Sequence, residues 1–171
     1  MARLSDLIRE RAPDSQHEEV SSRKVGSSSP SADHAWRVSA RQELVKIREA
    51  VRSSTSLQLT GCTSLARQLV QLLNQSDNLA GWALNGETED YALDNALHVA
   101  VLGTKVGMGL RYSQDELERL ALAGLLHDLG MWTLPVSLIE KREALSEEER
   151  DILRTHPERG RRILAGQGGV F

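Results

Sequence analysis

Two adjacent residues in the C-terminal half of the chain, His127 and Asp128, carry side chains that can bind a metal ion. They end a stretch, residues 121–128, that has no charged residue before Asp128, so we expect this end of the helix to be enclosed on all sides. A buried carboxylate beside an imidazole needs a compensating charge, which a metal ion supplies most directly. The pair therefore predicts a site for a first-row metal. In a second interpretation, Asp128 caps a backbone group and His127 packs in the core.

The helix that carries this pair has a clear start signal. Ser113 and Glu116 have the spacing of a capping box, which predicts a helix from about residue 114 to residue 128. We expect Gly130 to provide a left-handed C-cap, and Pro135 prevents the helix from continuing. Ser146 repeats the capping-box spacing and predicts a last helix over residues 147–156, with a further turn to residue 164.

Upstream, apolar residues recur at helical spacing in three segments. Residues 38–51 and 65–73 each predict an amphipathic helix, with a break near residues 53–61. A third helix over residues 91–110 has Val99, Leu102, Val106 and Leu110 on one stripe, with Asn95 one turn before Val99 on the same side. We expect this stripe to face inward and to carry Asn95 with it.

The pattern as a whole predicts an all-α helical bundle. Residues 1–37 are rich in Ser and are expected to be a mostly disordered N-terminal segment and linker. Residues 38–78 are expected to form two leading amphipathic helices, available for protein partners or self-association. Residues 79–171 are expected to form the domain that contains His127 and Asp128.

Composition excludes several classes of protein. The 171 residues have a net charge of −3, which gives no overall basic field for nucleic acid or anionic lipid. We expect no membrane span, because no stretch approaches the roughly 18 apolar residues that one needs. Cys62 is the single cysteine, so a disulfide framework is impossible and the cytoplasm is the expected compartment.

The segment from Leu125 to Leu164 resembles the HD-GYP family, a branch of the HD superfamily of metal-dependent phosphohydrolases. That family has an HD-x-G-K motif, a proline a few residues later, an extended segment, a capped helix and an HP..G..IL motif. The matching positions here are His127, Asp128, Gly130, Pro135, Leu138, Ile139, Lys141, Leu145, Ser146, Glu149, His156, Pro157, Gly160, Ile163 and Leu164. With the preceding helices, the resemblance extends from about Leu79 to Leu164.

The resemblance implies an HD-domain-like fold and a cyclic di-GMP phosphodiesterase. It implies that His127, Asp128 and His156 are ligands of a divalent metal such as Fe or Mn, and that Asp128 is the catalytic residue. The metal would polarise a phosphodiester and lower the pKa of an attacking water.

The chain departs from the family pattern at several positions. Asn95 stands where the family has its first His ligand, and Met131 stands where it has a lysine that assists at the phosphate. His98, three residues after Asn95, is a candidate substitute ligand, as is Asn95 itself. The expected C-terminal part, with further ligands and the GYP motif, does not follow Leu164. The reduced ligand set favours one ion over two, held between His127, Asp128 and His156.

Three functions remain open on these grounds. The chain is expected to be a weakly active or inactive relative of cyclic di-GMP phosphodiesterases. Alternatively, it is a non-catalytic signalling or binding module that uses the HD fold, or a fragment of a longer active phosphodiesterase. The module would lack turnover and would act through partner contacts of its amphipathic helices.

Overall fold

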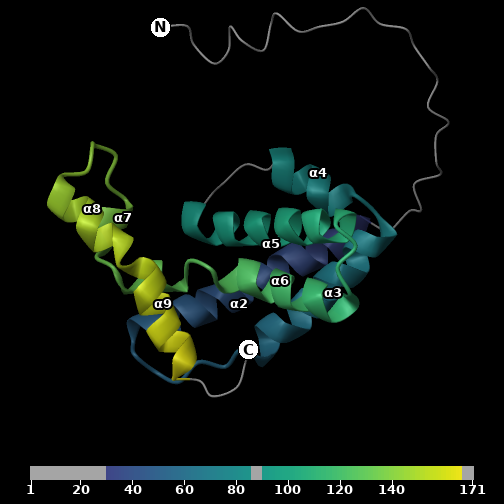
Figure 1. Ribbon diagram of the computed structural model, residues 1–171, viewed down its shortest axis with the longest axis horizontal. Helices are drawn as coiled ribbons and strands as arrows, with labels where there is room; N and C mark the ends of the chain where they lie inside the picture. The colour runs from purple at the N-terminus through teal and green to yellow at the C-terminus, as the bar shows by residue number, and fades with distance from the viewer. Residues whose placement is uncertain (1–29, 86–89, 167–171) are drawn as a thin grey trace, which may run out of the picture.

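The computed structural model describes residues 30–85 and 90–166, and every regular element in these two ranges is helical (Figure 1). The predicted all-α class is therefore confirmed. The α-helices are α2 (Pro30–Arg52), α3 (Thr60–Gln75), α4 (Asn78–Asn85), α5 (Tyr91–Gly109), α6 (Gln114–Leu126), α7 (Val136–Ile139), α8 (Glu147–Arg154) and α9 (His156–Ala165), and a 3-10 helix, η1 (Leu129–Thr133), joins α6 to α7.

Helix α2 begins earlier than the sequence analysis expected. Residues 30–37 were assigned to the mostly disordered segment, but they form the first two turns of α2. Trp36 attaches this part of α2 to the core: its ring is buried, and its indole N–H donates to the Leu65 carbonyl in α3 at 3.0 Å. The polar composition of the preceding residues gave no sign of this contact. The remainder of the predicted segment lies outside the described residues.

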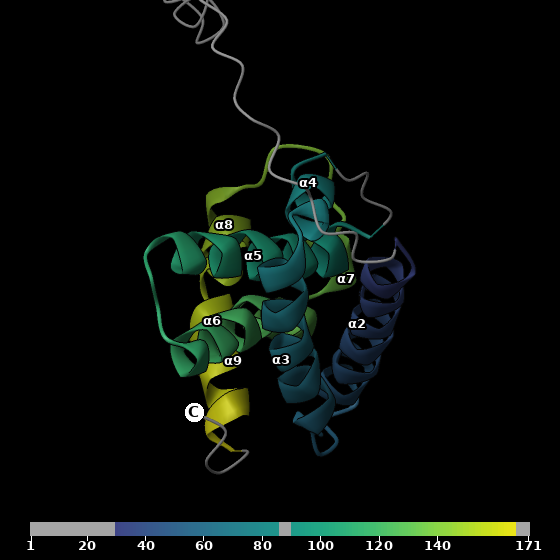
Figure 2. The same cartoon turned by 90° about the vertical axis from the view of Figure 1, so that its right-hand side faces the viewer.

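Helices α2 and α3 lie side by side and contribute their apolar faces to the same core as α5 and α6 (Figure 2). Buried residues along α2 include Leu44 and Ile47, and those along α3 include Leu69 and Leu73. The predicted break between them is present, since α2 ends at Arg52 and α3 begins at Thr60. Because these faces are used inside the molecule, a partner would have to meet a different surface of the two helices.

Helix α5 buries a different face from the one that the sequence pattern indicated. Val106 and Leu110 are more than 60% exposed, whereas Ala96, Ala100 and Thr104 are buried. The reason is a close helix–helix approach: a Cβ added to Gly124 of α6 would lie 2.5 Å from the Ala100 Cα. Small residues line this contact, so counting only the large apolar residues selects the wrong side of the helix.

Two ion pairs fasten α2 to the start of α5. Arg41 of α2 pairs with Asp94, whose side chain is 1% exposed, and Arg48 pairs with Asp90 at 2.5 Å. Asp90 is also the N-cap of α5, where its carboxylate accepts the Leu93 N–H. Asp94 is adjacent to Asn95, so these pairs fix the turn of α5 that carries a candidate ligand.

Both capping boxes predicted from the sequence are present, at Ser113 with Glu116 and at Ser146 with Glu149. The first opens α6 and the second opens α8, which places the ends of both helices within two residues of the expected positions. Among the described residues, no helix is long and apolar enough to cross a membrane.

Gly124→Ala tests the close contact between α5 and α6. The added methyl would meet the backbone of Ala100, so we expect the free energy of unfolding to fall by about 1–3 kcal/mol. Gly103→Ala is the matched control, because a Cβ at Gly103 has no neighbour within 4 Å. That variant should gain about 0.5–1 kcal/mol from helix propensity. Chemical denaturation measures both, and equal effects would refute the close-contact explanation.

Candidate metal centre

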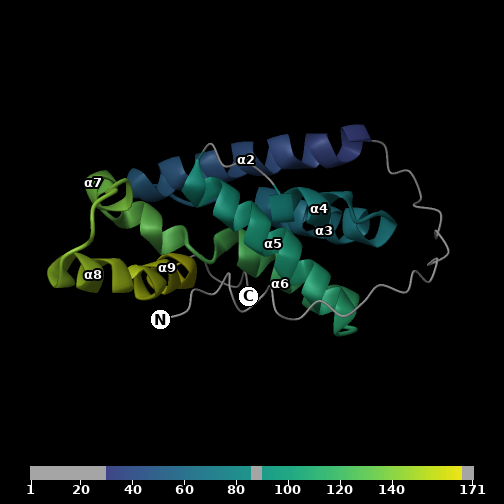
Figure 3. The same cartoon turned by 90° about the horizontal axis from the view of Figure 1, so that it is seen from above.

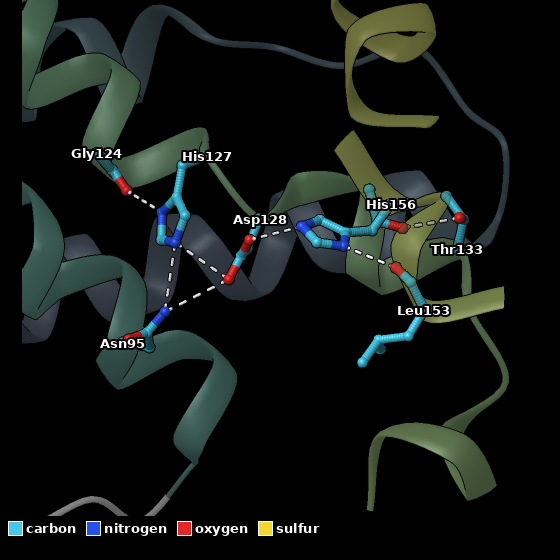
Figure 4. Close-up of polar contacts among 8 residues, drawn as sticks. Asn95, Gly124, His127, Asp128, Thr133, Leu153 and His156 are labelled. Carbon is cyan, nitrogen blue, oxygen red and sulfur yellow. Dashed lines mark hydrogen bonds and ion pairs between the residues drawn. The ribbon is translucent and has the colours of Figure 1, made fainter. Parts of the chain in front are cut away.

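Three elements that are distant in sequence bring the candidate site together. Asn95 comes from the second turn of α5, His127 and Asp128 follow the end of α6, and His156 begins α9. The polar contacts among these four side chains are shown in Figure 4.

Gly130 allows α9 to approach the HD segment. A Cβ at this position would lie 1.9 Å from the His156 carbonyl oxygen and 2.6 Å from the Gly160 nitrogen. Gly130 lies within η1 and does not provide the left-handed C-cap that we expected from the sequence. Its role is to let two backbones come close enough for His156 to reach Asp128.

The Asp128 carboxylate lies between two imidazoles, and each faces a different oxygen (Figure 4). His127 Nε2 is 3.1 Å from Oδ2, and His156 Nε2 is 3.3 Å from Oδ1. A carboxylate shared in this way can be contacted by positive charge from both sides. The two Nε2 atoms, which can bind a metal ion, therefore both lie beside the Asp128 carboxylate.

Backbone hydrogen bonds fix the orientation of both rings. His127 Nδ1 lies 2.8 Å from the Gly124 carbonyl oxygen, and His156 Nδ1 lies 2.8 Å from the Leu153 carbonyl oxygen. Because a carbonyl only accepts, Nδ1 carries the hydrogen in each neutral ring and Nε2 carries a lone pair. Anchoring one ring nitrogen to a backbone carbonyl is how metal-ligating histidines are held.

A lone pair on His127 Nε2 that faces a carboxylate oxygen requires a positive charge between the two atoms. Without a metal, a proton on Nε2 can supply that charge: the hydrogen bond that protonated His127 donates to Asp128 raises the pKa of His127, although partial burial opposes it. The same hydrogen bond lowers the pKa of Asp128, with smaller contributions from His156 and Asn95. A divalent cation can replace the proton in this position.

Asn95 completes a triangle of donor positions. Its Nδ2 is 3.3 Å from His127 Nε2 and 3.4 Å from Asp128 Oδ2, and those two atoms are 3.1 Å apart. Rotating the amide by 180° replaces Nδ2 with the acceptor Oδ1. Neighbouring ligands of an ion with bonds of about 2.1 Å are separated by about 3.0–3.4 Å. The spacing of Asn95, His127 and Asp128 therefore fits one ion.

Side chains of His, Cys, Asp and Glu alone do not form a set of three ligands for one metal ion in the described parts of the chain. Within residues 30–85 and 90–166, no three of them are arranged so that they could hold one ion. The reason is visible at Asp128, where His127 and His156 are directed at different oxygens. The amide of Asn95 is needed to complete a set of three around Oδ2.

The site is more open than the sequence indicated. The side chains of His127, Asp128 and His156 retain 31%, 29% and 27% of their exposure. Residues 121–126 are buried except for Ala123, which is exposed, and the side chains of His127 and Asp128 that follow them are partly exposed. A ligand can therefore reach the three side chains from solvent.

His98 is not brought into this cluster. Its ring packs edge-on against Trp82 with centroids 4.7 Å apart, and its Nε2 is buried with no hydrogen-bond partner among the described residues.

Two residues that position the site, Gly124 and Arg41, were not predicted from the sequence. Glycine next to a small-residue stripe is the signal for the first, whereas the Arg41–Asp94 pair depends on tertiary packing and has no local signal.

Comparison with known proteins identifies the family of the chain. The family model for the HD domain matches residues 49–167, so the chain belongs to the HD-domain family. The match begins at residue 49 and includes α3, which lies upstream of the domain boundary expected at residue 79. No solved structure matches the chain significantly.

Three curated relatives match part of the chain. The chain is 33% identical over 79 residues to the cyclic di-GMP phosphodiesterase response regulator RpfG of Xanthomonas campestris, covering 46% of this chain and 20% of that protein. It is 29% identical over 77 residues to the cyclic di-GMP phosphodiesterase PA4108 of Pseudomonas aeruginosa, covering 45% and 19%. It is 29% identical over 68 residues to the cyclic di-GMP phosphodiesterase PdeB of Borreliella burgdorferi, covering 40% and 18%. The chain thus spans about a fifth of each relative, and the resemblance to the HD-GYP family is confirmed.

The raised pKa of His127 predicts a specific titration. In metal-free protein, its ring should titrate above the ordinary 6.5, and Asp128→Asn should bring the midpoint back toward 6.5. Histidine ring signals in a heteronuclear NMR titration measure this, with His34, which is exposed, as the internal control. An unchanged His127 midpoint in the variant would refute the assignment of the shift to Asp128.

The sign of the stability change follows from the same two shifts. Protonated His127 stabilises the fold below pH 6.5, and this contribution is lost as the pH rises through the raised pKa. Ionised Asp128 contributes above pH 3.8, and its contribution is lost as the pH falls through the lowered pKa.

Proposed function

We propose that the chain is an HD-domain protein whose site holds one divalent metal ion, such as Mn²⁺ or Fe²⁺. His127 Nε2 and Asp128 Oδ2 are the primary ligands, and the Asn95 amide oxygen is the third. The observation that carries the proposal is the triangle of donor positions, with sides of 3.1, 3.3 and 3.4 Å. His156 faces Oδ1 and becomes a metal ligand only where the carboxylate turns or a second ion is bound.

The proposed substrate class is a cyclic dinucleotide, which appears in the names of all three relatives. A bound metal would supply polarisation of the phosphodiester and acidification of a water. The residues of this chain would hold Asp128 ionised, orient both imidazoles through backbone carbonyls and keep the site open to a ligand. We propose that the chain occupies the cytoplasm, where its buried cysteine remains a thiol.

Hydrolysis is proposed to be weak or absent. A two-ion mechanism needs enough anionic and imidazole ligands to hold both ions, and Asn95 contributes only a neutral oxygen. Met131 can donate no hydrogen bond to a phosphate and carries no charge. These two residues favour the second candidate function, a non-catalytic module that binds a metal and a ligand for signalling.

Metal titration of the wild type and of single variants tests the ligand assignment. Asp128→Asn and His127→Ala should each weaken Mn²⁺ binding by roughly 100-fold or more, because each removes a direct ligand. His156→Ala should weaken it by roughly 10-fold, the effect expected of a supporting residue. Isothermal titration calorimetry at constant pH measures all three.

The matched controls are Asp151→Asn and His34→Ala, which remove the same chemical groups from exposed positions. Both should bind Mn²⁺ as the wild type does. A loss in His156→Ala equal to that in His127→Ala would contradict the single-ion arrangement, and equal binding by Asp128→Asn and the wild type would contradict the site itself.

Turnover of cyclic di-GMP tests the proposed loss of activity. With Mn²⁺ or Fe²⁺ present, we expect no hydrolysis above the background of Asp128→Ala, as measured by chromatography of the products. Turnover by the wild type that disappears in Asp128→Ala would show that three donors suffice for catalysis and would overturn the proposal of weak or absent activity.

A further inference from the structure

The end of α2, the start of α5 and helix α7 lie at the same end of the molecule (Figure 3). A pocket lies between these elements. Its volume is about 560 Å³, within the usual range for small-molecule sites. The residues that line it come from α2, α5, η1 and α7 and from the segment after α7, and the metal-site residues His127, Asp128 and His156 are not among them. Its function is therefore a separate question from that of the metal centre.

The charges that line this pocket favour an anion. The lining contains three guanidinium groups, those of Arg48, Arg52 and Arg142, and two carboxylates, those of Asp90 and Glu140. Asp90 is already engaged, since it pairs with Arg48 at 2.5 Å and caps α5. Neither Arg52 nor Arg142 is paired with a carboxylate in the described parts of the chain, so two guanidinium groups, each able to donate a bidentate pair of hydrogen bonds, are available.

Two aromatic side chains form the rest of the recognition surface. Tyr91, the first residue of α5, lines the pocket and is 75% exposed, so its ring is accessible for stacking. Trp132 also lines the pocket and is 97% buried, yet its indole N–H has no hydrogen-bond partner among the described residues. A buried donor without a partner costs free energy unless a ligand or water satisfies it. Both features favour a ligand that combines a ring with an acceptor group.

We propose that this pocket binds a phosphate monoester that carries a planar ring, the chemical class that includes nucleoside monophosphates. Arg52 and Arg142 bind the phosphate, and the ring stacks on Tyr91. The proposal does not depend on the metal centre, because the residues of the two sites are different.

The indole signals of the full-length chain provide the test. In the ¹⁵N-labelled protein with a chelator present, adenosine 5′-monophosphate should shift the Trp132 indole signal in a saturable manner. The signal is assigned with Trp132→Phe. The Trp36 signal is the internal reference, because that N–H already donates to the Leu65 carbonyl. Arg52→Gln with Arg142→Gln should weaken binding at least tenfold, and Tyr91→Ala should weaken it as well.

Arg154→Gln with Arg161→Gln is the matched control, since it removes the same charge from exposed residues that pair with carboxylates on their own helices. This double variant should bind as the wild type does. A Trp132 signal that does not move, or equal binding after loss of Arg52 and Arg142, would overturn the proposal. Equal binding of inorganic phosphate would overturn the assignment of a ring to Tyr91, and equal binding of adenosine would overturn the assignment of a phosphate to the arginines.

Discussion

The position of one carboxylate, that of Asp128, is the constraint on which the rest of the site depends. It is contacted from both sides by imidazoles whose other nitrogens are held by backbone carbonyls. Neither ring can turn away without breaking a hydrogen bond of 2.8 Å. Positive charge at these rings, from a proton or from a bound cation, therefore stabilises the ionised carboxylate of Asp128.

Holding that carboxylate in place requires close backbone contacts that only glycine permits. Gly124 lets α6 approach α5, and Gly130 lets η1 approach the start of α9. The Arg41–Asp94 pair then fastens α2 to the turn of α5 beside Asn95. A buried ion pair of this kind adds little net stability, because desolvation offsets the attraction, but it specifies one geometry. The same elements thus form the core and align the ligands.

Features that depend only on residues close together in the chain could be predicted from the sequence. Both capping boxes, the break before Thr60 and the grouping of His127 with Asp128 follow from short-range patterns of side chains. The buried face of α5 could not be predicted in the same way, because Ala100 and Gly124 pack there and large apolar residues such as Val106 do not. The start of α2 was missed because Trp36 gains its anchor, the Leu65 carbonyl, only when α3 packs beside it. The buried face of α5 and the start of α2 are both determined by contacts between residues that are distant in the sequence.

The most direct test of the central claim is a crystal structure of the chain grown with Mn²⁺ and measured at the manganese absorption edge. An anomalous difference map locates the ion without reference to any assumed ligand. The account predicts one peak within bonding distance of His127 Nε2 and Asp128 Oδ2, with the Asn95 amide oxygen as the third protein ligand. A peak away from Asp128, or no peak at saturating Mn²⁺, would contradict it.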